Sequence, residues 1–117
     1  MDCALHTIMR RIAICQLKGR VAPRYDHSSE IVVFTVNNRK TIEERGVIPV
    51  GDMEPADQTA LFSRMSVEVV ICGGAPDDCQ ELMRKHSVRF IDNVIGDIDA
   101  VFHRYIMGKL NRGDIVD

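Results

Sequence analysis

The sequence predicts a three-layer α/β domain built around a mixed β-sheet. The chain has 117 residues, which is enough for one compact domain and too few for two of ordinary size. Its second half alternates short apolar runs with amphipathic segments, the pattern of parallel strands joined by covering helices. Its first half contains two β-rich runs separated by a turn, so we expect an antiparallel hairpin that extends the parallel part of the sheet.

The first half of the chain supplies three predicted strands. Residues 11–15 (RIAIC) form a short apolar run with β-branched side chains, and Gly19 suits the turn that follows. Residues 31–36 (IVVFTV) and residues 41–50 form the predicted hairpin. Its turn is expected at residues 37–38, because two asparagines tolerate the positive φ that tight hairpin turns require.

Helices and strands alternate after the hairpin. A helix is expected from Ala56, where apolar residues recur at near-helical spacing. Residues 67–72 (VEVVIC) predict a strand covered on both faces, closed by the glycine pair 73–74. Residues 77–86 then predict a helix with an acidic first turn, and residues 88–91 (VRFI) predict another short strand.

The last predicted helix carries the clearest amphipathic stripe in the sequence. Its apolar residues recur at helical spacing over residues 98–106. Asp97 is the expected N-cap, because its carboxylate can accept the free N–H groups of the first turn. Gly108 is expected to end the helix, since glycine readily adopts the left-handed conformation found there.

One domain, residues 10–110, accounts for all of these elements. We expect residues 1–9 to be a disordered leader and residues 111–117 to be a frayed tail. No apolar run approaches the roughly 20 residues that a membrane-spanning helix needs, and no secretory signal is visible, so the expected location is cytoplasmic. Four cysteines in such a chain indicate reduced thiols or metal ligands, not a disulfide framework.

Charge is distributed unevenly along a chain whose formal net charge is -2. The stretch from residue 3 to residue 25 contains no acidic residue, and its basic residues are Arg10, Arg11, Lys18, Arg20 and Arg24. Such a stretch is either a solvated basic flank or a site that attracts an anion: phosphate, nucleic acid or an anionic metal cluster. Nucleic acid is the weakest of these partners, because the domain is slightly acidic and has few aromatic rings on which bases could stack.

The candidate site lies at the expected carboxyl ends of the parallel strands. If the first strand and the strand at 67–72 are parallel neighbours, Cys15 and Cys72 share the edge where open α/β sheets bind ligands. The glycine pair 73–74 would let backbone N–H groups approach an anion closely there. Each cysteine has a second interpretation as a buried, inert thiol, and His27 has one as a solvated histidine.

Catalytic motifs are absent from the sequence. It contains no Ser–His–Asp order, no HExxH helix and no paired-carboxylate motif. Asp97 and Asp99 are two positions apart near a helix start, where they suit capping better than acid–base chemistry. The sequence therefore predicts a protein that is not an enzyme.

Four segments resemble the dinitrogenase iron-molybdenum cofactor biosynthesis family, which includes NifX and the C-terminal domain of NifB. They are RIAI at 11–14, GRVAPRY at 19–25, VEVVICGG at 67–74 and YIMGKL at 105–110. The most specific piece is VVICGG followed by a helix and the strand VRFI. The resemblance extends over nearly the whole predicted domain.

This resemblance implies both a fold and a function. The family's fold is ribonuclease H-like, a mixed five-stranded sheet flanked by helices, which agrees with the order of elements given above. The implied function is to bind, store or pass on a preformed iron-sulfur or molybdenum-containing cluster, in contact with other metal cofactor assembly proteins. The alternative is a regulatory or interaction module that uses the same fold without metal. The oligomeric state is not implied.

The resemblance also implies roles for particular residues. Because such clusters are anionic, Lys18, Arg20 and Arg24 would hold the cluster by charge. Cys72 matches the family's cysteine, and the glycine pair Gly73 and Gly74 matches the glycines that follow it. The implied metal ligands are Cys72 together with Cys15 or His27.

The chain departs from the family pattern at two places. Arg24 stands where the family commonly has a histidine, so His27 is the nearby residue that could replace it as a ligand. Asp26 stands where the family has a glycine. After Gly74 the family often has a Gly-Pro-Gly turn, whereas residues 75–78 of this chain read Ala-Pro-Asp-Asp. A divergent member with altered cargo fits these departures.

Overall fold

A mixed six-stranded sheet forms the centre of the molecule. In the computed structural model, which describes residues 9–116, five strands run in the order β4-β3-β1-β5-β6, and β2 pairs with the end of β1. The strands are β1 (Arg10–Leu17), β2 (Arg20–Val21), β3 (Glu30–Val36), β4 (Ile42–Pro49), β5 (Val69–Ile71) and β6 (Phe90–Ile91). The five-strand path agrees with the predicted mixed sheet, and β2 adds a sixth strand that the sequence did not predict.

Strand β1 joins the antiparallel and parallel parts of this sheet. On one side it pairs antiparallel with β3, which pairs antiparallel with β4, so the predicted hairpin is present. On the other side β1 pairs in parallel with β5, with Ile12 opposite Val69 and Ile14 opposite Ile71, and β5 pairs in parallel with β6. The two strands expected to be parallel neighbours are therefore neighbours.

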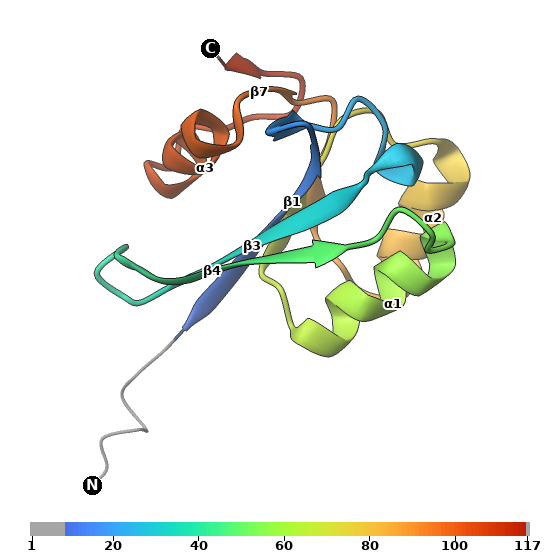
Figure 1. Cartoon of the computed structure of the whole chain (residues 1–117), viewed down its shortest axis with the longest axis horizontal. Helices are drawn as coiled ribbons and strands as arrows, with labels where there is room; N and C mark the ends of the chain where they lie inside the picture. Colours follow the sequence, from blue (N-terminus) through green and yellow to red (C-terminus); the bar gives the residue numbers. More distant parts are fainter. Residues whose placement is uncertain (1–8, 117) are drawn as a thin grey trace, which may run out of the picture.

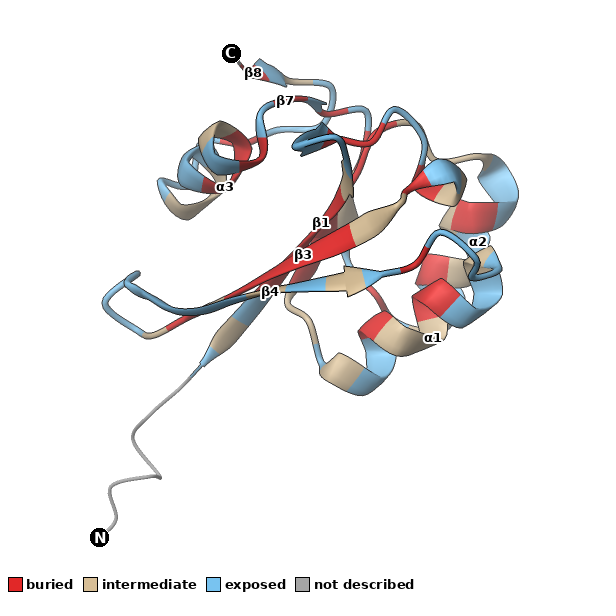
Figure 2. Ribbon diagram, in the orientation of Figure 1, coloured by how far each residue is buried: buried red, intermediate tan, exposed pale blue. Residues whose placement is uncertain are grey.

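Helices cover both faces of the sheet and complete three layers (Figure 1). Helices α1 (Pro55–Met65) and α2 (Asp77–Lys85) lie on one face, and α3 (Ile98–Ile106) lies on the other. Because side chains alternate along a strand, Ala13 and Cys15 of β1 enter the core under α1 and α2, whereas Ile12 and Ile14 enter the core under α3. Figure 2 shows the resulting burial of β1 and β3, beside the largely exposed edge strand β4.

The turn of the β3–β4 hairpin is built differently from the prediction. The Oδ1 of Asn37 accepts hydrogen bonds from the backbone N–H groups of Arg39 (2.8 Å) and Thr41 (3.1 Å). The residue with positive φ is Lys40, at 64°, and not the asparagine pair. Asn37 therefore stabilises the turn through its side chain, as asparagine does in Asx-turns.

The start and end of α3 follow the sequence prediction. Asp97 is the N-cap, and its carboxylate accepts hydrogen bonds from the N–H groups of Asp99 (3.1 Å) and Ala100 (3.2 Å). Gly108, with a φ of 74°, follows the last turn of the helix. Both features agree with the expected capping pattern.

The end of the chain differs from the frayed tail that the sequence predicts. Strand β8 (Ile115–Val116) pairs in parallel with β7 (Ile95–Gly96), and Val116 joins the core under α3. Of the predicted leader, residues 1–8 lie outside the described part of the chain. No helix within residues 9–116 is long and apolar enough to span a membrane. The ribonuclease H-like assignment stays a prediction.

Candidate functional site

The segment that follows β2 crosses the carboxyl ends of β1 and β5. Ala22 donates a backbone hydrogen bond to the carbonyl of Cys15 (2.8 Å). Gly74 donates to the carbonyl of Pro23 (2.7 Å), and Tyr25 donates to the carbonyl of Gly74 (2.8 Å). Residues 22–25 are therefore fixed by backbone bonds to both strand ends, so the two segments that the sequence analysis singled out meet here.

This crossing explains the glycine pair and corrects the role predicted for it. A Cβ at Gly73 would lie 2.2 Å from the carbonyl oxygen of Ala22 and 2.4 Å from that of Pro23, which leaves no space for a side chain. The N–H of Gly74 is used by Pro23, so it does not face a bound anion as the sequence analysis expected. Gly73 therefore permits a close approach of two backbone segments.

Two adjoining cavities lie beside the glycine pair. One has a volume of about 420 Å³ and is lined by Arg20, Val21, Pro23, Gly73, Gly74, Asn93, Val94 and Ile95. The other has a volume of about 310 Å³ and is lined by Arg24, Gly74, Ala75, Pro76 and Asn93. Because they share Gly74 and Asn93, we treat them as one site and call it the strand-end hollow. Each cavity contains one arginine and no carboxylate among its lining residues.

Arg24 is held in place by its neighbour Asp26. Its Nε and Nη2 donate to the two carboxylate oxygens of Asp26, both at 3.0 Å. This pairing raises the pKa of Arg24 and lowers the pKa of Asp26. The Nη1 of Arg24 has no hydrogen-bond partner among residues 9–116. The guanidinium is thus oriented at the hollow with one nitrogen available to a ligand.

The thiols predicted as metal ligands lie in the core, not in the hollow. Cys15 and Cys72 are both 0% exposed and belong to the core under α1 and α2. Burial raises the pKa of Cys15 to about 12 and that of Cys72 well above its ordinary value, so both thiols stay protonated at neutral pH. Within the described range, no three His, Cys, Asp or Glu side chains are grouped so that they could hold a metal ion.

Two other predicted site residues lie outside the hollow. Lys18 is exposed on the turn between β1 and β2, and it does not line either cavity. His27, at the end of the short 3-10 helix Tyr25–His27, is exposed, and its Nε2 lies 3.9 Å from a carboxylate oxygen of Asp26. Of the residues predicted for charge or close approach, the hollow brings together Arg20, Arg24, Gly73 and Gly74.

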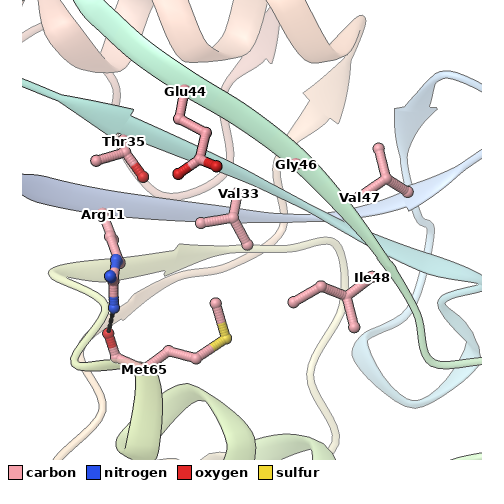
Figure 3. Close-up of a pocket in the computed structure, with 8 residues that line it drawn as sticks. All are labelled: Arg11, Val33, Thr35, Glu44, Gly46, Val47, Ile48 and Met65. Atoms are coloured by element: carbon pink, nitrogen blue, oxygen red, sulfur yellow. Dashed lines mark hydrogen bonds between the residues drawn. The ribbon is translucent and has the colours of Figure 1, made fainter.

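The basic stretch of the sequence does not form a single surface patch. Arg10 and Arg11 lie at the start of β1, at the opposite end of that strand from Lys18. Figure 3 shows Arg11 at a separate cavity of about 280 Å³ between β4 and α1, where its Nη1 donates to the carbonyl of Met65 (2.8 Å). Arg11 therefore does not contribute to the predicted anion site, because it lies at the other end of β1.

Asn93 is a site residue that the sequence analysis missed. It has a φ of 60°, it lines both cavities of the hollow, and its N–H donates to the carbonyl of Gly73 (2.9 Å). Asparagine tolerates this left-handed conformation better than most residues do. Its place in the sequence could have indicated this role. Asn93 follows the predicted strand at 88–91, and residues after neighbouring parallel strands lie at the same edge of the sheet.

An apolar pair borders the hollow. Ile95 of β7, which lines the larger cavity, lies directly opposite Ile115 of β8. Both side chains are exposed, at 52% for Ile95 and 65% for Ile115. The pairing of β7 and β8 therefore places two exposed apolar side chains next to each other beside the hollow.

Comparisons of this chain by sequence and by structure give different results. No family model matches the sequence, and no curated protein matches it. Solved structures match the fold at 20% identity or less in the cases given below. The mixed α/β fold is therefore what this chain shares with known proteins.

Three of these structures illustrate the likeness. The protein PH0822 gives a TM-score of 0.75 at 20% identity, over 87% of this chain and 95% of its own. A "putative dinitrogenase" (MJ0327) from Methanocaldococcus jannaschii gives 0.72 at 15% identity, over 90% of this chain and 95% of its own. The apo form of the orange protein from Desulfovibrio gigas gives 0.70 at 15% identity, over 95% of this chain and 98% of its own.

Proposed function

We propose that this protein is a non-enzymatic domain that binds an anionic metal-sulfur cluster and passes it to metal cofactor assembly proteins. The cluster is cargo, of iron-sulfur or molybdenum-containing type. The observation that carries the proposal is the strand-end hollow, in which Arg20 and Arg24 flank a cavity at the carboxyl ends of parallel strands. In open α/β sheets this edge is the usual place for a ligand.

The hollow suits a cargo that is held by charge. Arg20 supplies a positive charge that forms no ion pair within residues 9–116. Arg24 is paired with Asp26 but keeps N–H groups available, because Asp26 accepts from only two of its five N–H donors. Val21, Pro23 and Ile95 add apolar contacts, which suit the sulfide surface of a cluster. Because the thiols of Cys15 and Cys72 are buried and protonated, the cargo would keep its own sulfide ligands instead of taking thiolates from the protein.

Two further observations support this class of cargo. The VVICGG segment and its neighbours resemble the iron-molybdenum cofactor biosynthesis family, as described above. The fold is shared with a protein named as a dinitrogenase candidate and with the orange protein. Both likenesses are distant, so the proposal depends on the charge and position of the hollow.

Anaerobic reconstitution tests the proposal. The purified chain is incubated with tetrathiomolybdate, or with ferrous iron and sulfide, and then separated from small molecules by gel filtration. We expect a metal-sulfur chromophore to elute with the protein and to weaken in Arg20→Glu and Arg24→Glu, because each variant reverses a charge at the hollow.

Arg64→Glu is the matched control for these variants. Arg64 is exposed in the last turn of α1, before the start of β5, and it lines none of the cavities described here. The control should retain the chromophore of the unmodified chain. A protein that stays colourless with both reagents contradicts the proposal.

A second candidate function is a protein-interaction module that binds no metal. The burial of Cys15 and Cys72 favours it, and so does the exposed apolar pair of Ile95 and Ile115 beside the hollow. In that case a cofactor assembly protein would bind equally well with and without metal, and binding would survive replacement of all the cysteines. Loss of binding in Ile115→Asp, with retention in Arg64→Glu, would support this candidate over the first.

A further inference from the structure

A separate cavity lies at the opposite edge of the sheet, where the parallel strands begin. It has a volume of about 340 Å³ and is lined by Arg10, Lys40, Arg89, Ile91, Tyr105, Ile106, Gly108 and Leu110. Its three cations come from three places in the sequence. Arg10 starts β1, Lys40 belongs to the hairpin turn, and Arg89 immediately precedes β6. The fold therefore gathers basic side chains that no local pattern in the sequence connects.

One of these three charges is neutralised within the protein. Arg10 forms two hydrogen bonds to the carboxylate of Glu68, at 2.7 and 2.8 Å, and the hydroxyl of Tyr105 donates to the same carboxylate. The hydrogen bonds from Arg10 are the largest cause of the lowered pKa of Glu68, and the positive charge of Arg89 lowers this pKa further. The carboxylate of Glu68 thus accepts three hydrogen bonds from Arg10 and Tyr105.

The other two cations have no such partner. Neither Lys40 nor Arg89 forms an ion pair with any residue between 9 and 116. No carboxylate lines the cavity. The cavity therefore carries two positive charges that the described part of the chain does not compensate, which is the charge that a dianion would neutralise.

Part of the cavity's wall is aliphatic. Ile91, Ile106 and Leu110 line it and belong to, or pack against, the core under α3. A ligand in this cavity would meet both cationic and aliphatic side chains. Inorganic phosphate would satisfy only the first of these features, whereas an organic phosphate would satisfy both.

We propose that this cavity binds a small organic phosphate, with Lys40 and Arg89 on the phosphate and Ile91, Ile106 and Leu110 against its organic part. The planar guanidinium of Arg89 can donate two N–H groups to phosphate oxygens, and Lys40 adds a point charge. Arg10 lines the site but stays paired with Glu68. This site is independent of the strand-end hollow and of the function proposed for it.

Isothermal titration calorimetry with phenyl phosphate and inorganic phosphate at low ionic strength tests the proposal. We expect phenyl phosphate to bind at least about threefold more tightly than inorganic phosphate, because its ring contacts the apolar wall. Arg89→Glu and Lys40→Glu should each weaken binding by at least about tenfold, because each replaces an attraction by a repulsion. Equal affinity for the two probes would overturn the organic class of the ligand.

Two control variants identify the site that binds. Arg64→Glu makes the same charge change on α1, which covers the opposite face of the sheet, and it should leave binding unchanged. Arg20→Glu alters the strand-end hollow and should also leave it unchanged. If Arg20→Glu abolishes binding and Arg89→Glu does not, or if neither probe binds, the proposal is wrong. Circular dichroism of each variant verifies that the fold is retained.

Discussion

Gly73 lies at a close backbone crossing beside the strand-end hollow. The carbonyl oxygens of Ala22 and Pro23 approach its Cα so closely that a methyl group would overlap both. At Gly74 an added Cβ would lie 3.5 Å from its nearest neighbour, the carbonyl oxygen of Pro23, which is an ordinary contact. The close approach of the backbone therefore requires glycine at position 73 but not at position 74.

Gly73→Ala should lower the free energy of unfolding by more than about 2 kcal/mol, because residues 22–25 must shift and lose backbone hydrogen bonds. Gly74→Ala is the matched control and should cost less than about 1 kcal/mol. Urea denaturation followed by circular dichroism measures both values. Equal stabilities of the two variants would contradict the close approach at Gly73.

The three cysteines of the described region are expected to be unreactive in the folded protein. Cys15, Cys72 and Cys79 are each at most 1% exposed, and burial raises the pKa of all three. In a Cys3→Ser background, labelling by a thiol reagent at pH 8 should be at least about a hundredfold slower in the native protein than in guanidinium chloride. Rapid labelling of Cys72 in the native state would show that the thiol reaches the hollow.

At the scale of the element, the start of α3 contributes to the shape of the strand-end hollow. Asp97 caps the helix, and the N–H of Ile98 donates to the carbonyl of Gly19 (3.3 Å) in the turn that leads to Arg20. Arg20 and Asp97 also form an isolated backbone bridge. The position of Arg20 therefore depends on backbone contacts with the start of α3.

Asp97→Ala should destabilise the protein by about 1 kcal/mol, because two N–H groups of the first turn lose their acceptor. Asp97→Asn retains an accepting oxygen and should be close to the unmodified chain in stability. Thermal unfolding compares the three proteins. A loss of stability in Asp97→Asn as large as that in Asp97→Ala would show that the charge matters more than the hydrogen bonds.

The sequence predicts those elements that are long enough to show a hydrophobic period. Strand β1, the β3–β4 hairpin and the three helices meet this condition, and so does the apolar run that contains β5. Strands β2, β7 and β8 have two residues each and lie in no longer apolar run, so no period is visible, whereas the two residues of β6 belong to the predicted run 88–91. β8 also depends on a partner that lies 20 positions earlier in the sequence, Ile95 opposite Ile115, so its pairing is a property of the folded chain.

The sequence predicts where the site lies on the sheet, but it does not predict the burial of Cys15 and Cys72. The alternation of strands and helices predicts that Cys15, Cys72 and the glycine pair share one edge of the sheet, and they do. It does not predict that residues 22–25 cross over that edge, or that both thiols are buried in the core under α1 and α2. The basic stretch likewise divides between the two ends of β1, because Arg10 is the first residue of this eight-residue strand and Lys18 follows its last.

At the scale of the whole molecule, Glu68 links three parts of the fold. Arg10 of β1 and Tyr105 of α3 both donate to its carboxylate, which lies just before β5. The hydrogen bonds from Arg10 are the main cause of its lowered pKa. A carboxyl group whose pKa is lowered by folding stabilises the protein above its ordinary pKa of 4.5, and this stabilisation is lost as the pH falls below that value.

Glu68→Gln should therefore be less stable than the unmodified chain by about 1 kcal/mol at pH 7, and the difference should shrink as the pH falls below about 4.5. Protonated glutamate and glutamine resemble each other in size and charge, so the two proteins converge in acid. Urea denaturation at a series of pH values measures the difference. A difference that is constant from pH 7 to pH 3 would contradict a stabilising charge on Glu68.

The central claim is that the molecule holds an anionic metal-sulfur cargo by charge at the strand-end hollow, without thiolate ligands from Cys15 or Cys72. Anaerobic titration with tetrathiomolybdate, followed by absorbance, gives the dissociation constant for each variant. We expect Arg20→Glu/Arg24→Glu to weaken binding by at least about tenfold, while Cys15→Ala/Cys72→Ala and Arg64→Glu leave it within about twofold. Loss of binding in the cysteine variant, with retention in the arginine variant, would contradict the central claim.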